Sequence, residues 1–177
     1  MHLGVFDWHV PHAIGLCYNP RKGDTSMNRK QYEQLLKPLN PTRVSQREQA
    51  GRKFSYLEAW DVKAHLIRIF GFGGWSWTVT TAELAFEDNS NGKWNVGYKV
   101  IGTLTIPCLD CTYSEAAIGS STLGSRGDAH DMAIKTAESD ALKRAAINLG
   151  TQFGLSLYNN GGLVDVVVQT LDRADDE

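Results

Sequence analysis

Two adjacent cations, Lys143 and Arg144, stand in a stretch of the chain whose residue spacing predicts a long helix. Both side chains bind phosphate oxygens, the lysine as a point charge and the arginine through a planar fork of donors. Alanine recurs at every fourth position from Ala129 to Ala145, so one helix face is smooth enough to lie close on a sheet. The cations follow another line of the helix and would face away from the sheet, although a merely solvated face has the same composition.

The local charge also favours an anionic partner. The formal net charge is −2, but the segment 21–68 holds eleven basic and five acidic residues, a surplus of six positive charges. The segment from Asp165 to the last residue is acidic instead. The positive potential is therefore confined to part of the chain, as a binding surface for nucleic acid requires.

Catalytic groups are harder to find than cations. No arrangement of serine, histidine and aspartate is legible, and the glycines of 71–74 lack the lysine and hydroxyl residue of a phosphate-binding loop. Glu58 and Asp61, one helical turn apart, are the best pair of acids for a metal-dependent nuclease. We expect a protein that is not an enzyme and uses no cofactor.

The cysteines and the apolar runs bear on compartment and metal binding. Apolar runs are shorter than a membrane span, and the N-terminal residues lack the pattern of a signal peptide. Three cysteines argue against a disulfide framework. Cys108 and Cys111 have zinc-ligand spacing and three histidines precede Cys17, but no second CxxC or CxxH follows. We expect a cytoplasmic, nucleoid-associated protein with no membrane partner and no metal.

Periodicity predicts three helices. Apolar residues at helical spacing predict a short helix that Ser26 caps and Pro38 ends. The polar, basic segment 42–53 is expected to be a loop. A second helix, 56–70, would begin at the capping box of Ser55 and Glu58. The third, long helix would begin at caps provided by Asp128 and Asp131 and end before Gly150.

Between the second and third helices, side chains alternate with a period of two. Three antiparallel strands are predicted over 75–84, 93–106 and 111–123, and the Asn91-Gly92 pair predicts a hairpin turn between the first two. The segment 163–171 favours a strand over a short helix. The expected fold class is α+β, with a curved antiparallel three-stranded sheet in a β-β-β-α core and flanking helices.

Aromatic residues accompany the cations. Proteins that bind single strands stack rings on bases while lysine and arginine contact phosphates. The rings in suitable positions are those of Phe72, Trp75, Trp77, Trp94 and Tyr98. In an alternating strand, however, a large ring belongs to the core more often than to a binding surface.

Several motifs in register resemble the annealing domain of the Rad52 family of single-strand annealing proteins, especially its small, phage-encoded type. The matching segments are 55–79, 91–100 and 138–154, within a resemblance that covers roughly 54–158. Residues 70–75 match the family's FG-x-x-GW turn. Leu142 to Arg144, with Gly150, Phe153 and Gly154, match its LKR helix end.

The resemblance implies a core that assembles side by side into a homo-oligomeric ring, with single-stranded DNA in a positively charged groove around the outside. It assigns Lys143 and Arg144 to the floor of this groove and brings Arg126 and Lys135 near the family's outer-rim lysines. The full set of residues expected to bind DNA is Lys143, Arg144, Lys135, Arg126, Lys63, Phe72 and Lys99.

Three positions depart from the family's pattern. Its basic residue before the FG-x-x-GW turn falls on Asp61, so this DNA contact is lost or passes to Lys63. Its groove tyrosine falls on Phe72, which keeps a ring. A further arginine, one turn after the LKR sequence, falls on Ile147. These departures alter the expected path of the DNA and leave the expected fold unchanged.

We therefore expect an N-terminal arm with a short helix over 1–53, a DNA-annealing domain over 54–158 and a C-terminal segment with an acidic tail over 159–177. The expected function is annealing of complementary single strands in homologous recombination and DNA repair, without nucleotide hydrolysis. We expect no partner-binding tail like that of larger family members, so that this domain would itself recruit any host recombinase or single-strand-binding protein. A metal-dependent recombination nuclease is the alternative, and a purely structural ring-forming protein is a third.

Overall fold

The computed structural model describes residues 26–49, 51–159, 161–163 and 166–167 and has the predicted α+β class. Its helices are α1 (Arg29–Leu35), α2 (Ala59–Phe70) and α3 (Arg126–Ile147). The strands are β1 (Val44–Gln49), β2 (Arg52–Leu57), β3 (Ser76–Ser90), β4 (Lys93–Ile106) and β5 (Cys111–Leu123). Short 3-10 helices are η1 (Pro41–Arg43), η2 (Pro107–Leu109), η3 (Thr151–Phe153) and η4 (Leu155–Tyr158).

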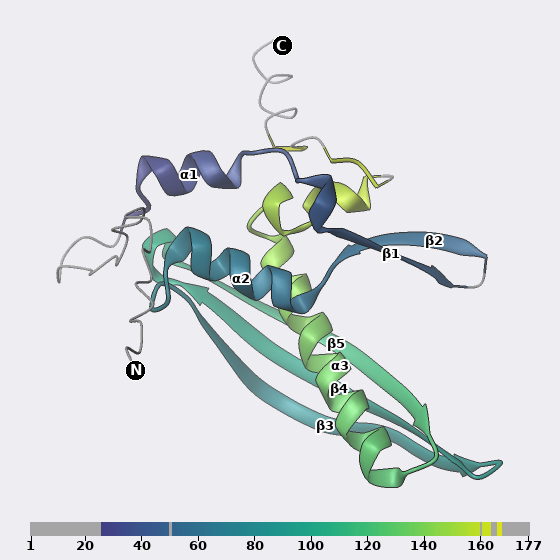
Figure 1. Ribbon diagram of the computed structural model, residues 1–177. Coiled ribbons are helices and arrows are strands. Elements are labelled where there is room, and N and C mark those ends of the chain that lie inside the picture. The colour runs from purple at the N-terminus through teal and green to yellow at the C-terminus, as the bar shows by residue number, and fades with distance from the viewer. Residues whose placement is uncertain (1–25, 50, 160, 164–165, 168–177) are drawn as a thin grey trace, which may run out of the picture.

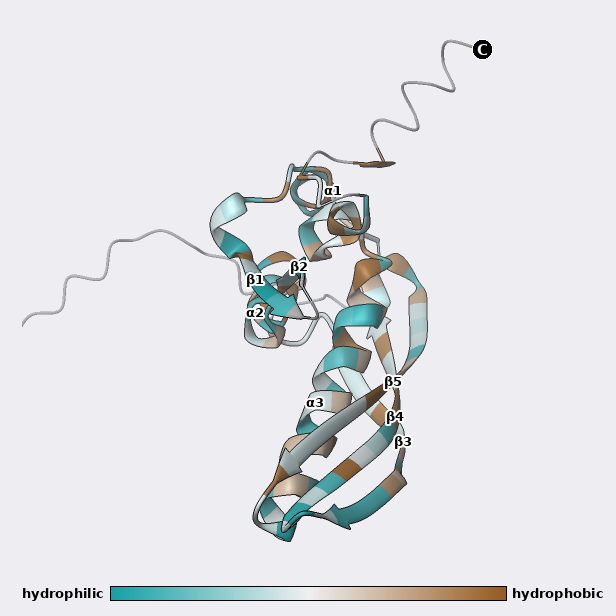
Figure 2. Cartoon of the chain, turned by 90° about the vertical axis from the view of Figure 1, so that its right-hand side faces the viewer, coloured by the Kyte–Doolittle hydropathy of each residue, from teal (hydrophilic) through white to brown (hydrophobic). Residues whose placement is uncertain are grey.

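The three long strands form the predicted antiparallel sheet in the order β3-β4-β5. The Asn91-Gly92 turn joins β3 to β4, and both residues have positive φ angles, 55° and 72°, as a tight hairpin requires. The long helix α3 crosses one face of this curved sheet, and no helix of the described residues covers the other face (Figures 1 and 2).

The alanine ridge of α3 is the surface that meets the sheet, as predicted. Ala129, Ala133 and Ala137 are fully buried. The contact is close, because a Cβ at Gly119 of β5 would lie 2.2 Å from the backbone nitrogen of Ala137. A side chain at this position would push the helix away, so glycine is required there.

The main core lies where α2, the last turns of α3 and one end of the sheet meet. The largest buried side chains there are Phe70, Phe153, Leu39, Leu66, Leu104, Ile106 and Leu142. α1 is attached to this core through the buried Gln31, whose amide donates to the backbone oxygen of Ile69 at 3.0 Å.

The segment expected to be a loop is instead half of a β-hairpin. β1 and β2 pair antiparallel without a bulge, and Gly51 at the turn has a φ of 73°. Figure 1 shows this hairpin projecting away from the sheet and helices. Its residues are mostly polar, and β1 is largely hydrophilic in Figure 2, so the segment lacks the apolar alternation that marks a strand.

The predicted start of the second helix was also wrong, because its first two residues belong to the hairpin. Ser55 and Tyr56 lie in β2, and α2 begins only at Ala59. Glu58 is the N-cap residue and makes no side-chain cap hydrogen bond. Pairing of Ser55 with Gln46 across the hairpin thus takes precedence over the local capping box.

Other element ends differ by a few residues. Asn28, not Ser26, caps α1 in a capping box with Gln31. α3 begins two residues early, because the Ser125 hydroxyl accepts from the backbone N–H of Asp128. Of the segment 163–171, only 163, 166 and 167 are described; Val166 and Val167 are helical rather than extended, which contradicts the predicted strand there.

Candidate nucleic-acid interface

The predicted cation pair lies near the C-terminal end of α3, on the side away from the alanine ridge. The Lys143 side chain is 26% exposed, and its Nζ lies 2.7 Å from Oδ1 of Asp140. The Arg144 side chain is more exposed, and its Nε lies 3.5 Å from Oε2 of Glu115 on β5. Both cations are accessible, and each is held by one partly exposed carboxylate.

Tyr56 connects these cations to the hairpin. The Nζ of Lys143 lies 5.7 Å from the centroid of the Tyr56 ring. The guanidinium carbon of Arg47, on β1, lies at the same distance of 5.7 Å from that centroid. A hydrogen bond with Glu58 raises the pKa of Tyr56 above its ordinary value, so the ring stays a neutral phenol. The ring therefore bridges two cations from distant parts of the chain.

Sequence reasoning missed Arg47 and Tyr56 as site residues. Arg47 was assigned to a loop and Tyr56 to the first turn of a helix. The available signal was Gly51 followed by a short stretch in which Arg52, Phe54 and Tyr56 stand at every second position.

Asp61, at the position aligned with the family's basic residue, has a structural role. Its carboxylate is buried in α2 and lies 2.8 Å from Nη2 of Arg43. Arg43 also donates to Oε1 of Gln152 at 3.0 Å. Because Asp61 is occupied in this way, the pair that it forms with Glu58 in the sequence is not a metal site. No group of three or more metal-ligating side chains occurs among the described residues.

Phe72 is 90% exposed in the turn after α2, so a core role for this ring is wrong. Lys63 is also exposed, on α2 itself. The other candidate rings are partly buried: Trp75, Trp77, Trp94 and Tyr98 all pack against core clusters. Of the predicted rings, Phe72 is the one that the described structure leaves open for stacking.

The remaining predicted cations lie elsewhere. Arg126 is bound by Glu87 at 2.7 Å, and Lys135 by Asp131 at 2.6 Å. At 1.5 Å per residue, Arg126 lies about 26 Å along α3 from Lys143. Lys99 pairs with Glu83 at 3.8 Å on the sheet face opposite to α3. Lys143 and Arg144 therefore lie side by side in the structure, and Arg126, Lys135 and Lys99 do not contact them.

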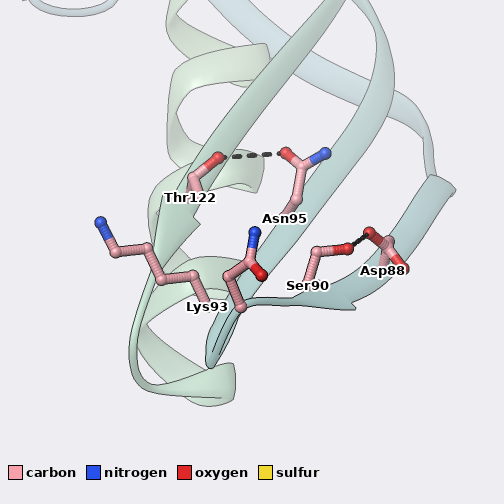
Figure 3. A pocket seen from close by; sticks show the side chains of 6 residues that line it. Asp88, Ser90, Lys93, Asn95 and Thr122 are labelled. Atoms are coloured by element: carbon pink, nitrogen blue, oxygen red, sulfur yellow. Dashed lines mark hydrogen bonds between the residues drawn. The ribbon is translucent and has the colours of Figure 1, made fainter.

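A polar hollow lies at the far end of the sheet, beside the β3–β4 turn (Figure 3). Its lining residues are Asp88, Ser90, Asn91, Lys93, Asn95 and Thr122. The Thr122 hydroxyl donates to Oδ1 of Asn95 at 3.1 Å, and Ser90 hydrogen-bonds to Asp88. The hollow lies beside the β3–β4 turn, away from Lys143 and Arg144, so it is not the centre of the site.

No helix in the described residues is both long and apolar enough to cross a membrane. The two cysteines of the CxxC pair, Cys108 and Cys111, are free thiols beside the core. Burial raises the pKa of Cys108, which keeps that thiol protonated. Cys17 and the three histidines before it lie outside the described residues.

Comparison with known proteins gives a consistent result. A family model described as "Rad52/22 family double-strand break repair protein" matches residues 28–173. "DNA repair and recombination protein rad22" of Schizosaccharomyces pombe is 34% identical over 137 residues, which are 75% of this chain and 29% of the relative. "DNA repair and recombination protein RAD52" of Saccharomyces cerevisiae is 32% identical over 145 residues, 80% of this chain and 30% of the relative.

A third relative, "DNA repair and recombination protein radC" of Emericella nidulans, is 35% identical over 130 residues, 71% of this chain and 22% of the relative. The chain therefore spans about a third or less of the length of these curated relatives. All three are fungal, so they do not support the phage origin expected from the sequence.

Proposed function

Because this chain belongs to the Rad52/22 family of double-strand break repair proteins, we propose that it binds single-stranded DNA and anneals complementary strands in recombination and repair. The observation that carries the proposal is the pair of the partly exposed Lys143 and the exposed Arg144, next to the ring of Tyr56 and the guanidinium of Arg47. Cations interleaved with aromatic rings are the usual equipment of single-strand binding.

The carboxylates beside the cations define how a strand would bind. Asp140 and Glu115 hold Lys143 and Arg144 in place while no DNA is bound. A phosphate makes stronger, charge-assisted contacts with the same donors, and the partly exposed ion pairs contribute little to stability. DNA would therefore replace these carboxylates without disturbing the fold.

Annealing follows if the protein holds each DNA strand by its phosphate backbone. When the cations neutralise phosphates, the repulsion between two complementary strands falls, and the bound strand keeps its base edges free for pairing. Formation of base pairs is downhill, so the reaction needs no nucleotide hydrolysis. The proposed reaction requires no catalytic group.

A homo-oligomeric ring is part of the proposal, as the resemblance implies. Both β3 and β5 are edge strands in the described chain, with long rows of backbone groups that pair with no other strand there. Exposed edges of this length favour association with further copies. Light scattering should give a mass many times the 19.6 kDa of one chain. A host recombinase or single-strand-binding protein would dock on this assembly.

The test is the double variant Lys143→Ala with Arg144→Ala. It should abolish annealing, weaken binding of a labelled single strand and lower the salt slope of binding by about 1.4, at about 0.7 per lost phosphate contact. The matched control is Arg29→Ala with Lys30→Ala, an adjacent pair of exposed cations on α1. Equal affinity and slope for both doubles would refute the proposal, as would magnesium-dependent degradation of the strand by the wild type.

A further inference from the structure

Residues 172–177 form an acidic segment, the acidic tail, whose charge is opposite to that of the cation pair on α3. The segment holds four acidic side chains and one basic one, a surplus of three negative charges. It lies outside the described residues, and its sequence alone gives its charge. The acids are Asp172, Asp175, Asp176 and Glu177.

The described structure fixes the point from which this tail starts. The backbone N–H of Val166 donates to the hydroxyl of Thr151 at 3.4 Å. Thr151 begins η3, four positions after Ile147, the last residue of α3. Lys143 precedes Ile147 by a further four positions, so the Cα atoms of Lys143 and Thr151 lie within about 20 Å of each other. The chain therefore enters its last residues within a short distance of the cation pair.

The chain beyond Val167 is long enough to reach these cations. Ten residues follow Val167 in the sequence. An extended chain of ten residues spans at most about 33–36 Å. This length exceeds the separation of Thr151 from Lys143, even after allowance for the side chain and hydrogen bond that join Thr151 to Val166. The acids at the end of the tail can thus contact the cations without a change in the described fold.

The two cations have donors to offer to further carboxylates. An ammonium carries three N–H donors and a guanidinium five. Among the described residues, Lys143 and Arg144 each form an ion pair with one carboxylate, and both side chains are accessible. The site therefore accepts carboxylate oxygens already, and donors remain for more of them.

A connection through the same chain makes such weak contacts effective. One exposed ion pair strengthens binding only about 1.4- to 5-fold. A short tether, however, gives the attached group a local concentration of the order of millimolar. Carboxylates of the tail can therefore compete with the phosphates of a strand, although a strand with many phosphates displaces them.

We propose that the acidic tail, together with the two carboxylates already there, binds Lys143 and Arg144 while no DNA is bound, and that a single strand must displace it. The inference rests on the proposed function, because the tail would regulate the same two cations. Every ligand of the site loses the same factor in affinity to the tail. Only strands with enough phosphate contacts then bind, so the tail restricts the site to long single strands.

A carbodiimide tests the contact in the full chain, because it condenses an amine and a touching carboxylate to an amide and takes up the water released. Peptide mapping by mass spectrometry should find Lys143 joined to the tail, and excess oligothymidylate should suppress this cross-link. Lys93, exposed at the far end of the sheet, is the internal control. A tail joined to Lys93 as often as to Lys143, or not joined to Lys143 at all, would overturn the proposal.

A second measurement uses a variant in which the four acids of the tail become amides. It should bind a labelled oligothymidylate about 2- to 25-fold tighter at low salt, the product of two exposed ion pairs. Its affinity should also fall more steeply with salt than that of the wild type, because salt weakens the competing tail as well. The substitutions are Asp172→Asn, Asp175→Asn, Asp176→Asn and Glu177→Gln.

The matched control makes the same change of charge at four exposed acids elsewhere in the described chain. Its substitutions are Glu33→Gln, Asp88→Asn, Asp110→Asn and Asp128→Asn. The control should gain less affinity than the tail variant, and equal gains would mean that net charge acts instead of a contact.

The two proposals can fail separately. If the wild type anneals strands while the cross-link and the extra gain are both missing, the DNA-binding function stands and the tail contact fails. If the wild type binds no oligothymidylate, the proposed function fails, whereas the cross-link, which forms without DNA, still tests the tail.

Discussion

The guanidinium of Arg43 donates to both carboxylate oxygens of Asp61, with N–O distances of 2.8 to 3.1 Å. The two side chains are only 10% and 7% exposed. The pair joins the segment before the hairpin to α2, and Gln152 extends it to η3 and to the backbone oxygens of Lys37 and Pro38. Asp61, which in the sequence resembles a lost DNA contact, thus connects three segments of the fold through Arg43 and Gln152.

Asp61→Ala should destabilise the fold strongly. Removal of one partner leaves the Arg43 charge buried and unpaired, which costs about 3–5 kcal/mol in the free energy of unfolding. Chemical denaturation measures this change. Asp131→Ala, which breaks the exposed pair with Lys135, is the control and should cost less than about 1 kcal/mol. Similar costs for the two variants would contradict a structural role of Asp61.

The protein should become less stable as the pH falls, because His65 must then take up a proton. Burial, and then the positive charge of Arg43, lowers the pKa of His65 below its ordinary value of 6.5. The unfolded chain therefore takes up a proton near pH 6.5, while the folded chain stays neutral to lower pH. The contribution is complete above pH 6.5 and is lost as the pH falls through the folded-state pKa.

His65→Gln checks this prediction. The drop in melting temperature between pH 7.5 and 5.5 should be smaller in the variant than in the wild type. The substitution also removes packing atoms, which changes the melting temperature at every pH. The change in melting temperature between the two pH values is therefore the quantity that tests the titration. Parallel pH profiles would show that His65 does not titrate in this range.

Glu115→Gln should tighten DNA binding. The carboxylate of Glu115 competes with phosphate for Arg144, and an amide of the same shape competes less. An exposed ion pair is worth about 0.2–1 kcal/mol, so affinity should rise about 1.4- to 5-fold. Glu83→Gln, on the opposite face of the same sheet, is the control and should leave affinity unchanged. Fluorescence anisotropy with a labelled strand measures both, and a gain for Glu83→Gln alone would place the DNA on the other face.

Phe72→Ala should keep the stability of the wild type and lose DNA affinity. The ring is 90% exposed, so its removal leaves no cavity. If it stacks on a base, affinity falls by about 1–3 kcal/mol, and Phe72→Tyr restores it. Phe70→Ala, two residues earlier and buried, should instead cost about 3–5 kcal/mol of stability. Unchanged affinity of Phe72→Ala would place the strand away from this turn.

Local patterns predicted the parts of the fold that local chemistry determines. Asn91-Gly92 fixed the β3–β4 turn, and the fourfold recurrence of alanine identified the face of α3 that meets the sheet. The partner of Asp61 could not be predicted in this way, because Arg43 lies 18 positions away in the chain and no periodicity links them.

The hairpin was missed for a related reason. The pair Ser55 and Glu58 has the spacing of a helix cap, and local spacing alone cannot show that Ser55 pairs with Gln46 in another strand. Tyr56 then appeared to be a helical residue, and its place between Arg47 and Lys143 depends on contacts between distant segments. The cation pair itself was predicted, and the ring beside it was not.

The close contact between Gly119 and α3 determines where the cations stand. A shift of the helix by one residue would turn its side chains by about 100° and bring a larger residue than Ala137 against the sheet. The contact therefore disfavours a one-residue shift of the helix, and Lys143 lies about 9 Å from Ala137 along the same axis. Gly119, in the middle of β5, thereby helps to determine where Lys143, the proposed phosphate-binding residue, lies, although the two residues are far apart in the sequence.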